Sequence, residues 1–372
     1  MSSICMGVIK FIKALNTQRI RFFRQIRKSI SLRVAYFLFE KRRTRFSVSE
    51  IHLAQKIGLV MVGTGIGDAI VMSGLIKILH LAGKMVFVIC DYRQYQIYSE
   101  LISVDKIFIV KEGRGGYKSA KSLNIHVDVV VDFRDPDHKL YERIWLLQAV
   151  KYKYAVGFNQ TDLRFFDVNI LRDEIKTHWS DRLLDFAKLL HVKFKNFSYD
   201  LHFSDLTKVR VNELVKNIHK NKIVIFNPTA SDRYRSLSIE FIQELLTYLG
   251  RMSNVAVIVL NVKDKNLIKE FPNVIFNPFV GLGENFYLVS KCSLMITVDT
   301  SLVHVGNFFD VVMIGIYNNR LADGKYNNNI LWGPNYPKAI QVFSCDHEGT
   351  ETGDDLRKFQ FQELEKKLRK IL

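Results

Sequence analysis

The amino-acid sequence predicts an α/β protein made of two doubly wound domains that follow one another along the chain. Short apolar runs, typical of strands buried on both faces of a parallel sheet, alternate with amphipathic helical segments. This alternation starts near residue 57 and starts again near residue 222. The length of 372 residues suits two domains of ordinary size. Two such domains leave a cleft between them, and ligands of this fold class bind beyond the carboxyl ends of the strands.

The first half of the chain begins with an apolar run at 57–62, which is followed by a glycine-rich turn at 63–68. Apolar residues then recur at helical spacing from Ile70 to Leu79. The next two strands are predicted at 85–90 and 127–133. A strand, a turn, a helix and a further strand form the repeating unit of a doubly wound sheet.

The second half repeats this pattern. It predicts strands at 222–226, 255–260, 274–276, 294–298 and 311–317, and helices at 239–249, at 286–291 and from the residue after Ser301 through Phe308. We therefore divide the chain into a basic helical extension, a first domain, a second domain and a C-terminal helix that packs back on the first domain. The corresponding ranges are 1–50, 51–205, 206–350 and 351–372.

Charge sets the N-terminal extension apart from the rest of the chain. The formal net charge is +17, and residues 1–50 hold twelve basic residues but only Glu40 and Glu50 as acids. A basic amphipathic helix can lie in a membrane interface beside anionic lipids. The alternative is a helix that packs on the body and leaves its charges in water. We expect an anionic membrane surface as the partner and no nucleic acid, because no nucleic-acid-binding motif follows.

Composition narrows the remaining classes. Apolar residues make up 48% and charged residues 24%, which excludes a disordered chain, a collagen-like repeat and a small disulfide scaffold. No stretch reads as a transmembrane helix, and the apolar run at 4–9 is too short for a signal peptide. Four widely spaced cysteines show no metal-ligand spacing, so we expect no metal site and reduced thiols in the cytoplasm.

The turn at 63–68 admits three interpretations. Its glycines resemble a dinucleotide fingerprint, but the spacing is GxGxGD, and a carboxylate at Asp68 would repel a pyrophosphate. An acid at the start of a helix that faces a cleft suits a general base. Asp68 would equally serve as a helix cap, stabilised by the helix dipole.

Two loops of the second domain carry polar side chains at strand ends. Asp299, Thr300, Ser301 and His304 follow the strand at 294–298, where hydroxyls and free N–H groups form either an anion site or an ordinary helix cap. The turn at 227–231 leads to Arg235, which could neutralise a diphosphate or lie in solvent.

In their order along the chain these motifs resemble glycosyltransferase family 9, the heptosyltransferases that build the lipopolysaccharide core. The resemblance spans about residues 57–345 and rests on five motifs. These are the GxxGD-like turn ending at Asp68, Asp128-Val-Val-Val-Asp132-Phe-Arg134, Val156-Gly157-Phe158, Asn227-Pro-Thr-Ala-Ser231 with Arg235, and Val298-Asp299-Thr300-Ser301-Leu-Val-His304.

The resemblance implies a GT-B arrangement of two Rossmann-like domains and an inverting sugar transfer that requires no cofactor or metal. Asp68 would be the catalytic base. A nucleotide-sugar donor, typically ADP-heptose, would bind the second domain through Thr229, Ser231, Arg235, Asp264, Asp299, Thr300, Ser301 and His304. A lipid-anchored, phosphorylated core oligosaccharide would be the acceptor on the first domain.

Two features of this sequence depart from the family pattern. Arg235 replaces the usual lysine, and the surroundings of Asp264 lack the usual glycines, which bears on the identity of the donor.

The candidate residues for binding the acceptor are Gly67, Arg93, Arg134, Lys139 and Arg143. The alternative for the four basic residues among them is ordinary surface charge.

We therefore expect a heptosyltransferase of the inner core, peripheral on the inner face of the bacterial inner membrane. One alternative is a transferase of the same fold that uses another nucleotide sugar for a surface glycan. Two others come from different classes: an NAD-dependent oxidoreductase, and a non-catalytic protein that binds membrane surfaces.

Overall fold

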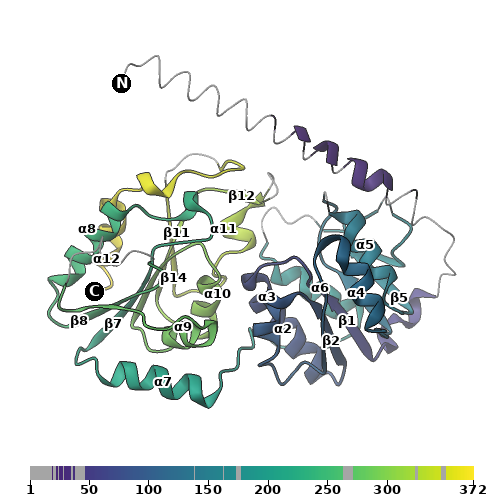
Figure 1. Ribbon diagram of the computed structural model, residues 1–372, viewed down its shortest axis with the longest axis horizontal. Helices are drawn as coiled ribbons and strands as arrows, with labels where there is room; N and C mark the ends of the chain where they lie inside the picture. Colours follow the sequence, from purple (N-terminus) through teal and green to yellow (C-terminus); the bar gives the residue numbers. More distant parts are fainter. Residues whose placement is uncertain are drawn as a thin grey trace.

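The computed structural model describes residues 47–137, 139–161, 163–172, 177–262, 271–322, 326–344 and 349–372, with scattered positions between 19 and 37. Two six-stranded parallel sheets, one per domain, lie side by side with helices around them (Figure 1). The prediction of two doubly wound α/β domains is therefore confirmed.

The first sheet has the strand order β3-β2-β1-β4-β5-β6. Its strands are β1 (Lys56–Val60), β2 (Met85–Cys90), β3 (Lys106–Ile109), β4 (Val129–Asp132), β5 (Tyr154–Phe158) and β6 (Val168–Ile170). The helices of this half are α2 (Ile66–Leu81), α3 (Tyr92–Tyr98), α4 (Gly116–Ser122), α5 (Leu140–Gln148) and α6 (Ser180–Leu189), with short 3-10 turns η1 (Val48–Leu53) and η2 (Gly113–Gly115).

The second sheet has the strand order β14-β11-β10-β7-β8-β9. Its strands are β7 (Lys222–Asn227), β8 (Val255–Val259), β9 (Val274–Phe276), β10 (Leu294–Val298), β11 (Met313–Tyr317) and β14 (Ala339–Phe343), and a small hairpin joins β12 (Leu321–Ala322) to β13 (Tyr326–Asn327). The helices are α7 (Asp205–Lys216), α8 (Ile239–Gly250), α9 (Leu282–Val289), α10 (Leu302–Phe308), α11 (Asn328–Leu331) and α12 (Phe361–Leu368), with 3-10 turns η3 (Arg233–Arg235) and η5 (Leu356–Lys358).

Helix α2 shows why this sequence forms its central elements. Gly65 precedes the helix in extended conformation, and the helix is buried along most of its length between the first sheet and its neighbours. The chain turns after α2 at Gly83, whose φ of +74° is a backbone conformation that glycine adopts without strain. The buried helix fixes where its first turn points, and that turn carries Asp68.

The two domains pack tightly against each other. A single apolar cluster contains side chains from both sheets, and α2 packs against both α6 and α10. The rings of Trp179 and Trp332 stack across the junction with their centroids 4.7 Å apart. The backbone N–H of Trp179 donates to the carbonyl of Leu331 at 2.9 Å. The facing loops of the two domains are therefore held in contact.

The C-terminal helix lies elsewhere than predicted. We expected residues 351–372 to pack back on the first domain, but α12 packs against α8 of the second domain. The ring of Phe361 lies 6.0 Å from that of Phe241 and 5.5 Å from that of Tyr248, centroid to centroid. The physical reason is that α12 is amphipathic, and its apolar face completes the core between α8 and the second sheet.

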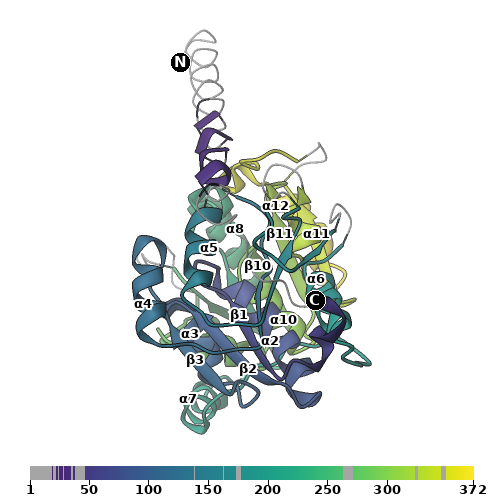
Figure 2. The ribbon, with the colours of Figure 1, turned by 90° about the vertical axis from the view of Figure 1, so that its right-hand side faces the viewer.

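The predicted helical extension over 1–50 lies mostly outside the described residues. The positions described between 19 and 37 are helical, and this segment stands over α5 (Figure 2). The hydroxyl of Ser31 accepts a hydrogen bond from the backbone N–H of Tyr141 at 3.0 Å. Among the helices that the structure describes, none has both the length and the apolar character needed to cross a membrane.

Candidate active site

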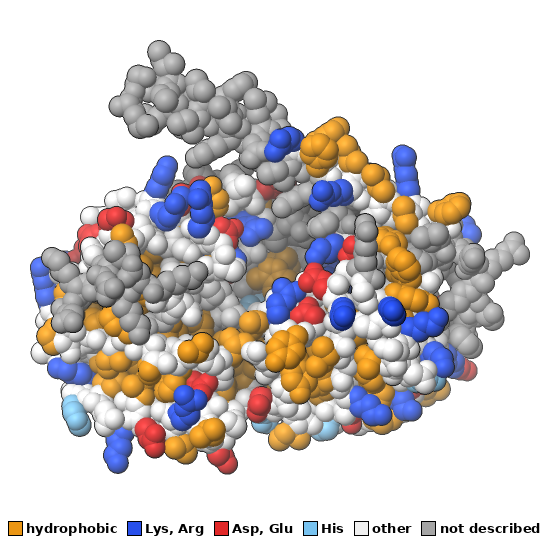
Figure 3. Space-filling model, viewed as in Figure 1, with side chains coloured by type: hydrophobic (Ala, Val, Ile, Leu, Met, Phe, Trp, Pro, Cys, Tyr) orange, Lys and Arg blue, Asp and Glu red, His pale blue; other side chains and the backbone are white. Residues whose placement is uncertain are grey.

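The candidate site residues gather at the switch points of the two sheets. The strand order reverses between β1 and β4 in the first sheet and between β7 and β10 in the second. Loops that leave such a pair of strands run in opposite directions and leave room for a ligand. Asp68 follows β1, Arg235 follows β7, and Asp299 follows β10. The face of the molecule in Figure 3 is hollowed between the two domains.

Asp68 lies in the first turn of α2 and is half-buried. Its Oδ2 accepts a hydrogen bond from the backbone N–H of Gly65 at 2.5 Å, so the predicted capping contact is present. Burial raises the pKa of Asp68 to about 6, against the opposing effects of the Gly65 hydrogen bond and the positive charge of Arg134. The carboxylate is therefore mostly ionised at neutral pH yet basic enough to accept a proton.

Gly67 brings the first turn of α2 against the second domain. A Cβ atom at this position would lie 3.2 Å from Cδ2 of His304 and 3.7 Å from Cα of Ser301. The lack of a side chain thus allows α2 and α10 to approach closely. The structure therefore joins the predicted base and two predicted donor-side residues across the domain junction.

His304 is buried at this junction. Burial, with a smaller effect of nearby His178, lowers the pKa of His304 to about 3, so the ring is neutral at physiological pH. The hydroxyl of Tyr199 lies 3.4 Å from Nδ1 of His304. A neutral imidazole held between two aromatic side chains can shape the site and offer a hydrogen bond, but it carries no charge for a diphosphate.

Arg235 and Ser231 form one unit with Asp299. Nη1 of Arg235 donates to the backbone carbonyl of Asp299 at 3.0 Å and lies 3.5 Å from its Oδ2, while Nη2 donates to the Ser231 hydroxyl at 3.2 Å. Nε is buried and has no hydrogen-bond partner among the described residues. Burial raises the pKa of Asp299, although Arg235 counteracts this. The guanidinium is thereby fixed beside the β10 loop.

Asn227, at the end of β7, organises the loops around it, although the sequence analysis did not select it as a site residue. Its buried Nδ2 donates to the hydroxyls of Thr297 at 3.0 Å and Thr300 at 3.2 Å. Its Oδ1 accepts from Nδ2 of Asn261 at 2.9 Å, and the carbonyl of Asn261 accepts from the Thr229 hydroxyl at 2.9 Å. The available signal was its place at the end of the first strand of the second domain.

Asp264, one of the predicted donor-binding residues, lies outside the described residues. Its proposed role therefore stays a prediction from the sequence.

The predicted acceptor-side arginines lie in the first domain and differ in their surroundings. Arg143 is buried, and its three nitrogens donate to Asp132, Asp137 and the carbonyl of Asp135. Arg134 donates to Asp132 and to the carbonyl of Val62, whereas Arg93 is more than half exposed and pairs with Asp91 and Glu112.

Asp132 explains this arrangement. It is fully buried at the end of β4, and burial acts to raise its pKa. The guanidinium groups of Arg143 and Arg134 outweigh that effect and hold the pKa below its usual range. The Arg143 guanidinium is therefore committed to a buried ion pair, whereas the side chains of Arg93 and Lys139 are about half exposed.

Comparison with known proteins bears on the family and on the fold. The model of glycosyltransferase family 9 (heptosyltransferase) matches residues 143–347. No curated protein sequence matches the chain.

Three solved structures illustrate the structural likeness. A family 9 glycosyltransferase from Veillonella parvula DSM 2008 is 17% identical, with a TM-score of 0.70, over 85% of this chain and 97% of that one. The E. coli ADP-heptose lps heptosyltransferase II is 14% identical, with a TM-score of 0.63, over 85% and 98% of the two chains. E. coli heptosyltransferase WaaC with ADP is 14% identical, with a TM-score of 0.61, over 84% and 97%. At such identities the likeness concerns the fold, and it confirms the expected GT-B arrangement.

Proposed function

Because the chain belongs to glycosyltransferase family 9, we propose that it transfers a heptose from ADP-heptose to the lipopolysaccharide inner core with inversion at the anomeric carbon. Membership in this family makes the chain a transferase, so the oxidoreductase and the non-catalytic alternatives are set aside. Of the E. coli structures with the same fold, one is an ADP-heptose lps heptosyltransferase and another is a heptosyltransferase with ADP. ADP-heptose is therefore the first donor to test.

The observation that carries this proposal is the placement of Asp68. A carboxylate with a pKa of about 6 stands at the switch point of the first domain, one residue from the contact with His304 and Ser301 of the second. An acceptor hydroxyl on the first domain would lose its proton to Asp68 as its oxygen attacks the anomeric carbon. The C–O bond to the nucleoside diphosphate would break in the same displacement.

The second domain would stabilise the charge that develops on the leaving diphosphate. Arg235 is held by Ser231 and Asp299 before any ligand arrives, so its charge needs little rearrangement during the reaction. Thr229 and Thr300 belong to the hydrogen-bonded loops around Asn227, and we assign them to the donor site with Ser301. No metal ion is part of this proposal, and transfer should persist in the presence of EDTA.

The acceptor would be a phosphorylated sugar anchored in lipid, and we propose a peripheral location on the inner face of the bacterial inner membrane. The basic N-terminal segment and its exposed apolar side chains support this location. A surface glycan built from another nucleotide sugar is the remaining alternative, and comparing ADP with GDP, UDP and CMP in a thermal-shift titration separates the two.

The decisive test is the Asp68→Asn variant. Since a general base contributes about 100-fold to 10,000-fold to a rate, turnover of ADP-heptose with a lipid-linked core acceptor should fall by about that factor. The thermal shift that ADP causes should stay unchanged, because the amide preserves the shape of the side chain. Wild-type turnover in Asp68→Asn would show that another group accepts the proton.

A further inference from the structure

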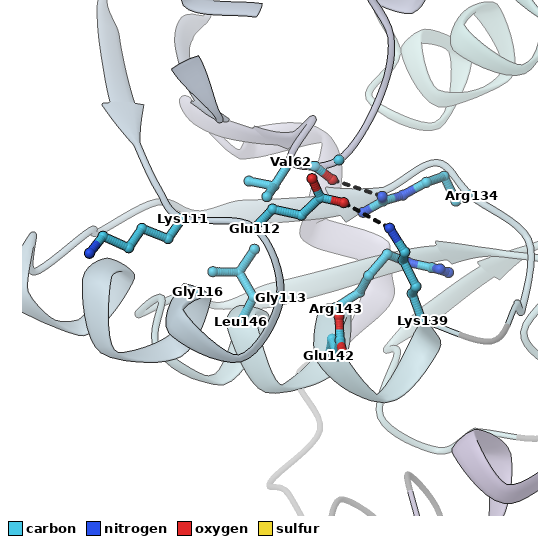
Figure 4. A pocket seen from close by; sticks show the side chains of 11 residues that line it. Val62, Lys111, Glu112, Gly113, Gly116, Arg134, Lys139, Glu142, Arg143 and Leu146 are labelled. Atoms are coloured by element: carbon cyan, nitrogen blue, oxygen red, sulfur yellow. Dashed lines mark hydrogen bonds and ion pairs between the residues drawn. The ribbon is translucent and has the colours of Figure 1, made fainter. Parts of the chain in front are cut away.

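A pocket in the first domain lies next to the Asp68 loop, at the carboxyl ends of β1, β3 and β4 (Figure 4). Four cationic side chains line it: Lys111, Arg134, Lys139 and Arg143. Two acids, Glu112 and Glu142, line it as well. Basic and acidic side chains gather on this side of the hollow between the domains (Figure 3). A concave surface with an excess of positive charge is suited to an anionic ligand.

Glu112 pairs with two cations here, Lys139 of the pocket lining and Arg93, which lies outside that lining. Its Oε1 accepts a hydrogen bond from Nζ of Lys139 at 2.7 Å, and its Oε2 accepts one from Nη2 of Arg93 at 3.0 Å. Arg93 lies in the first turn of α3, which follows β2, and Lys139 lies at the start of α5, which follows β4. The carboxylate therefore bridges two elements on either side of the β1 loop. The side chain of Glu112 is 40% exposed, which leaves it free to turn out into solvent.

Gly63 makes room for this carboxylate. Its φ of +81° is a conformation that favours glycine, and a Cβ atom there would lie only 3.1 Å from Oε1 of Glu112. The loop after β1 therefore has no side chain at the point where the Glu112 carboxylate lies. A glycine at such a point lets a ligand group approach the backbone closely.

Arg134, which lines the same pocket, has one hydrogen-bond donor that no described residue accepts. Its Nε donates to Asp132 and its Nη1 to the carbonyl of Val62, but its Nη2 is buried without a hydrogen-bond partner among the described residues. A buried guanidinium nitrogen without an acceptor is unfavourable, so a ligand oxygen that reaches it gains a charge-assisted hydrogen bond. Arg143, whose nitrogens all donate within the protein, offers no such donor.

We propose that this pocket binds the phosphate of a phosphorylated sugar and that Glu112 occupies the phosphate position until the ligand displaces it. A phosphomonoester carries close to two negative charges at neutral pH and three acceptor oxygens, whereas the carboxylate of Glu112 carries one charge. It can therefore bind Arg93 and Lys139 in place of Glu112 and satisfy Nη2 of Arg134 in addition. A neutral sugar has no charge with which to displace the carboxylate. This selectivity rests on the proposed function, in which the first domain receives a phosphorylated acceptor.

The test uses isothermal titration of the full-length protein with glucose 6-phosphate, inorganic phosphate and glucose. We expect glucose 6-phosphate to bind more tightly than inorganic phosphate, and glucose not to bind. The Glu112→Gln variant should bind glucose 6-phosphate about fivefold to tenfold more tightly, because the competing charge is gone. Lys139→Ala should bind it about tenfold more weakly, and because Lys139 is half exposed this variant keeps the buried ion pairs intact.

Glu142→Gln is the matched control. It removes the same charge from the same pocket, but the described residues give Glu142 no cation to release, so the affinity should change less than about twofold. Equal gains in affinity in Glu112→Gln and Glu142→Gln would overturn the proposal that the ligand displaces Glu112. Unchanged or weaker binding in Glu112→Gln would overturn it as well, as would tight binding of inorganic phosphate without binding of glucose 6-phosphate.

ADP binding measured in the same samples separates this proposal from the proposed function. If ADP raises the unfolding temperature while glucose 6-phosphate fails to bind, only the phosphate pocket is wrong. If glucose 6-phosphate binds as expected while neither ADP nor another nucleotide binds, the donor assignment is wrong and the pocket stands.

Discussion

At the scale of single residues, the pKa of Asp68 predicts how activity depends on pH. Burial raises this pKa to about 6, and a general base works only when it is ionised. We therefore expect kcat/KM to rise with pH and to level off above about pH 6, as measured by a pH–rate profile between about pH 5 and pH 8. Arg134→Gln removes a positive charge that lowers the pKa of Asp68, so the rising limb of the pH–rate profile should move to higher pH in this variant. A profile without this limb contradicts the assignment.

The same carboxylate makes a prediction about stability. The folded-state pKa of Asp68 lies above its unfolded value of 3.8, so its contribution to stability is fully present below pH 3.8 and is lost as pH rises through about 6. Asn carries no charge at any pH. Asp68→Asn should therefore gain stability relative to the wild type between about pH 5 and pH 8, which thermal unfolding at both pH values measures. An unchanged difference across this range would show that the carboxylate is not destabilised by burial.

Arg143 illustrates how burial decides what a charged residue does. Its partner Asp132 is fully buried, so Arg143→Met leaves a buried charge with one cation fewer and should cost about 3–5 kcal/mol of unfolding free energy. The control is Arg93→Met, because Arg93 is 56% exposed and its ion pairs contribute about 1 kcal/mol or less. Urea unfolding measures both. Equal losses in the two variants would argue against a structural role for Arg143.

At the scale of secondary-structure elements, the contact between α2 and α10 couples the two domains. Gly67→Ala would place a Cβ 3.2 Å from His304, so the first turn of α2 must move by a few tenths of an ångström. We expect transfer to fall about tenfold or more, since small displacements of catalytic groups are costly, while ADP binding is kept. Gly115→Ala is the control, because its Cβ would meet only the Lys111 side chain at an ordinary distance. Unchanged turnover in Gly67→Ala would show that the contact is not needed.

The elements also show what the sequence could predict. Uninterrupted apolar runs marked β2 at 85–90 and β10 at 294–298 with the bounds that the structure has, because strands buried on both faces are short, continuous and apolar. Four strands of the two six-stranded sheets were not predicted: β3, β5, β6 and β14. The short β3 and β6 and the partly buried β14 lack such a run, and Gly157 interrupts the run of the fully buried β5. The motifs placed Asp68 and Arg235 at strand ends, whereas the pairing of Glu112 with Lys139 joins loops whose proximity only the sheet order determines.

At the scale of the whole molecule, the N-terminal segment relates the acceptor pocket to a membrane. Ser31 holds this segment to the start of α5, and Lys139 of the pocket directly precedes α5. A segment that lay in a bilayer would therefore hold the pocket near the lipid surface, where a lipid-anchored acceptor is found. The exposed aromatic side chains of Phe22 and Phe23 are available for insertion, and the basic residues of 1–50 for anionic headgroups.

This arrangement predicts the outcome of vesicle sedimentation with the full-length protein. Phe22→Ser combined with Phe23→Ser should weaken binding to phosphatidylglycerol vesicles about tenfold, because two apolar rings no longer enter the interface. Added salt should weaken binding of the wild type, since exposed charges are screened. The control is Val280→Ser, which removes an even more exposed apolar side chain from the second domain and should leave binding unchanged. If the double variant bound vesicles as well as the wild type while ADP binding was intact, the segment would have a role other than membrane attachment, and the acceptor would have to reach the pocket by another route.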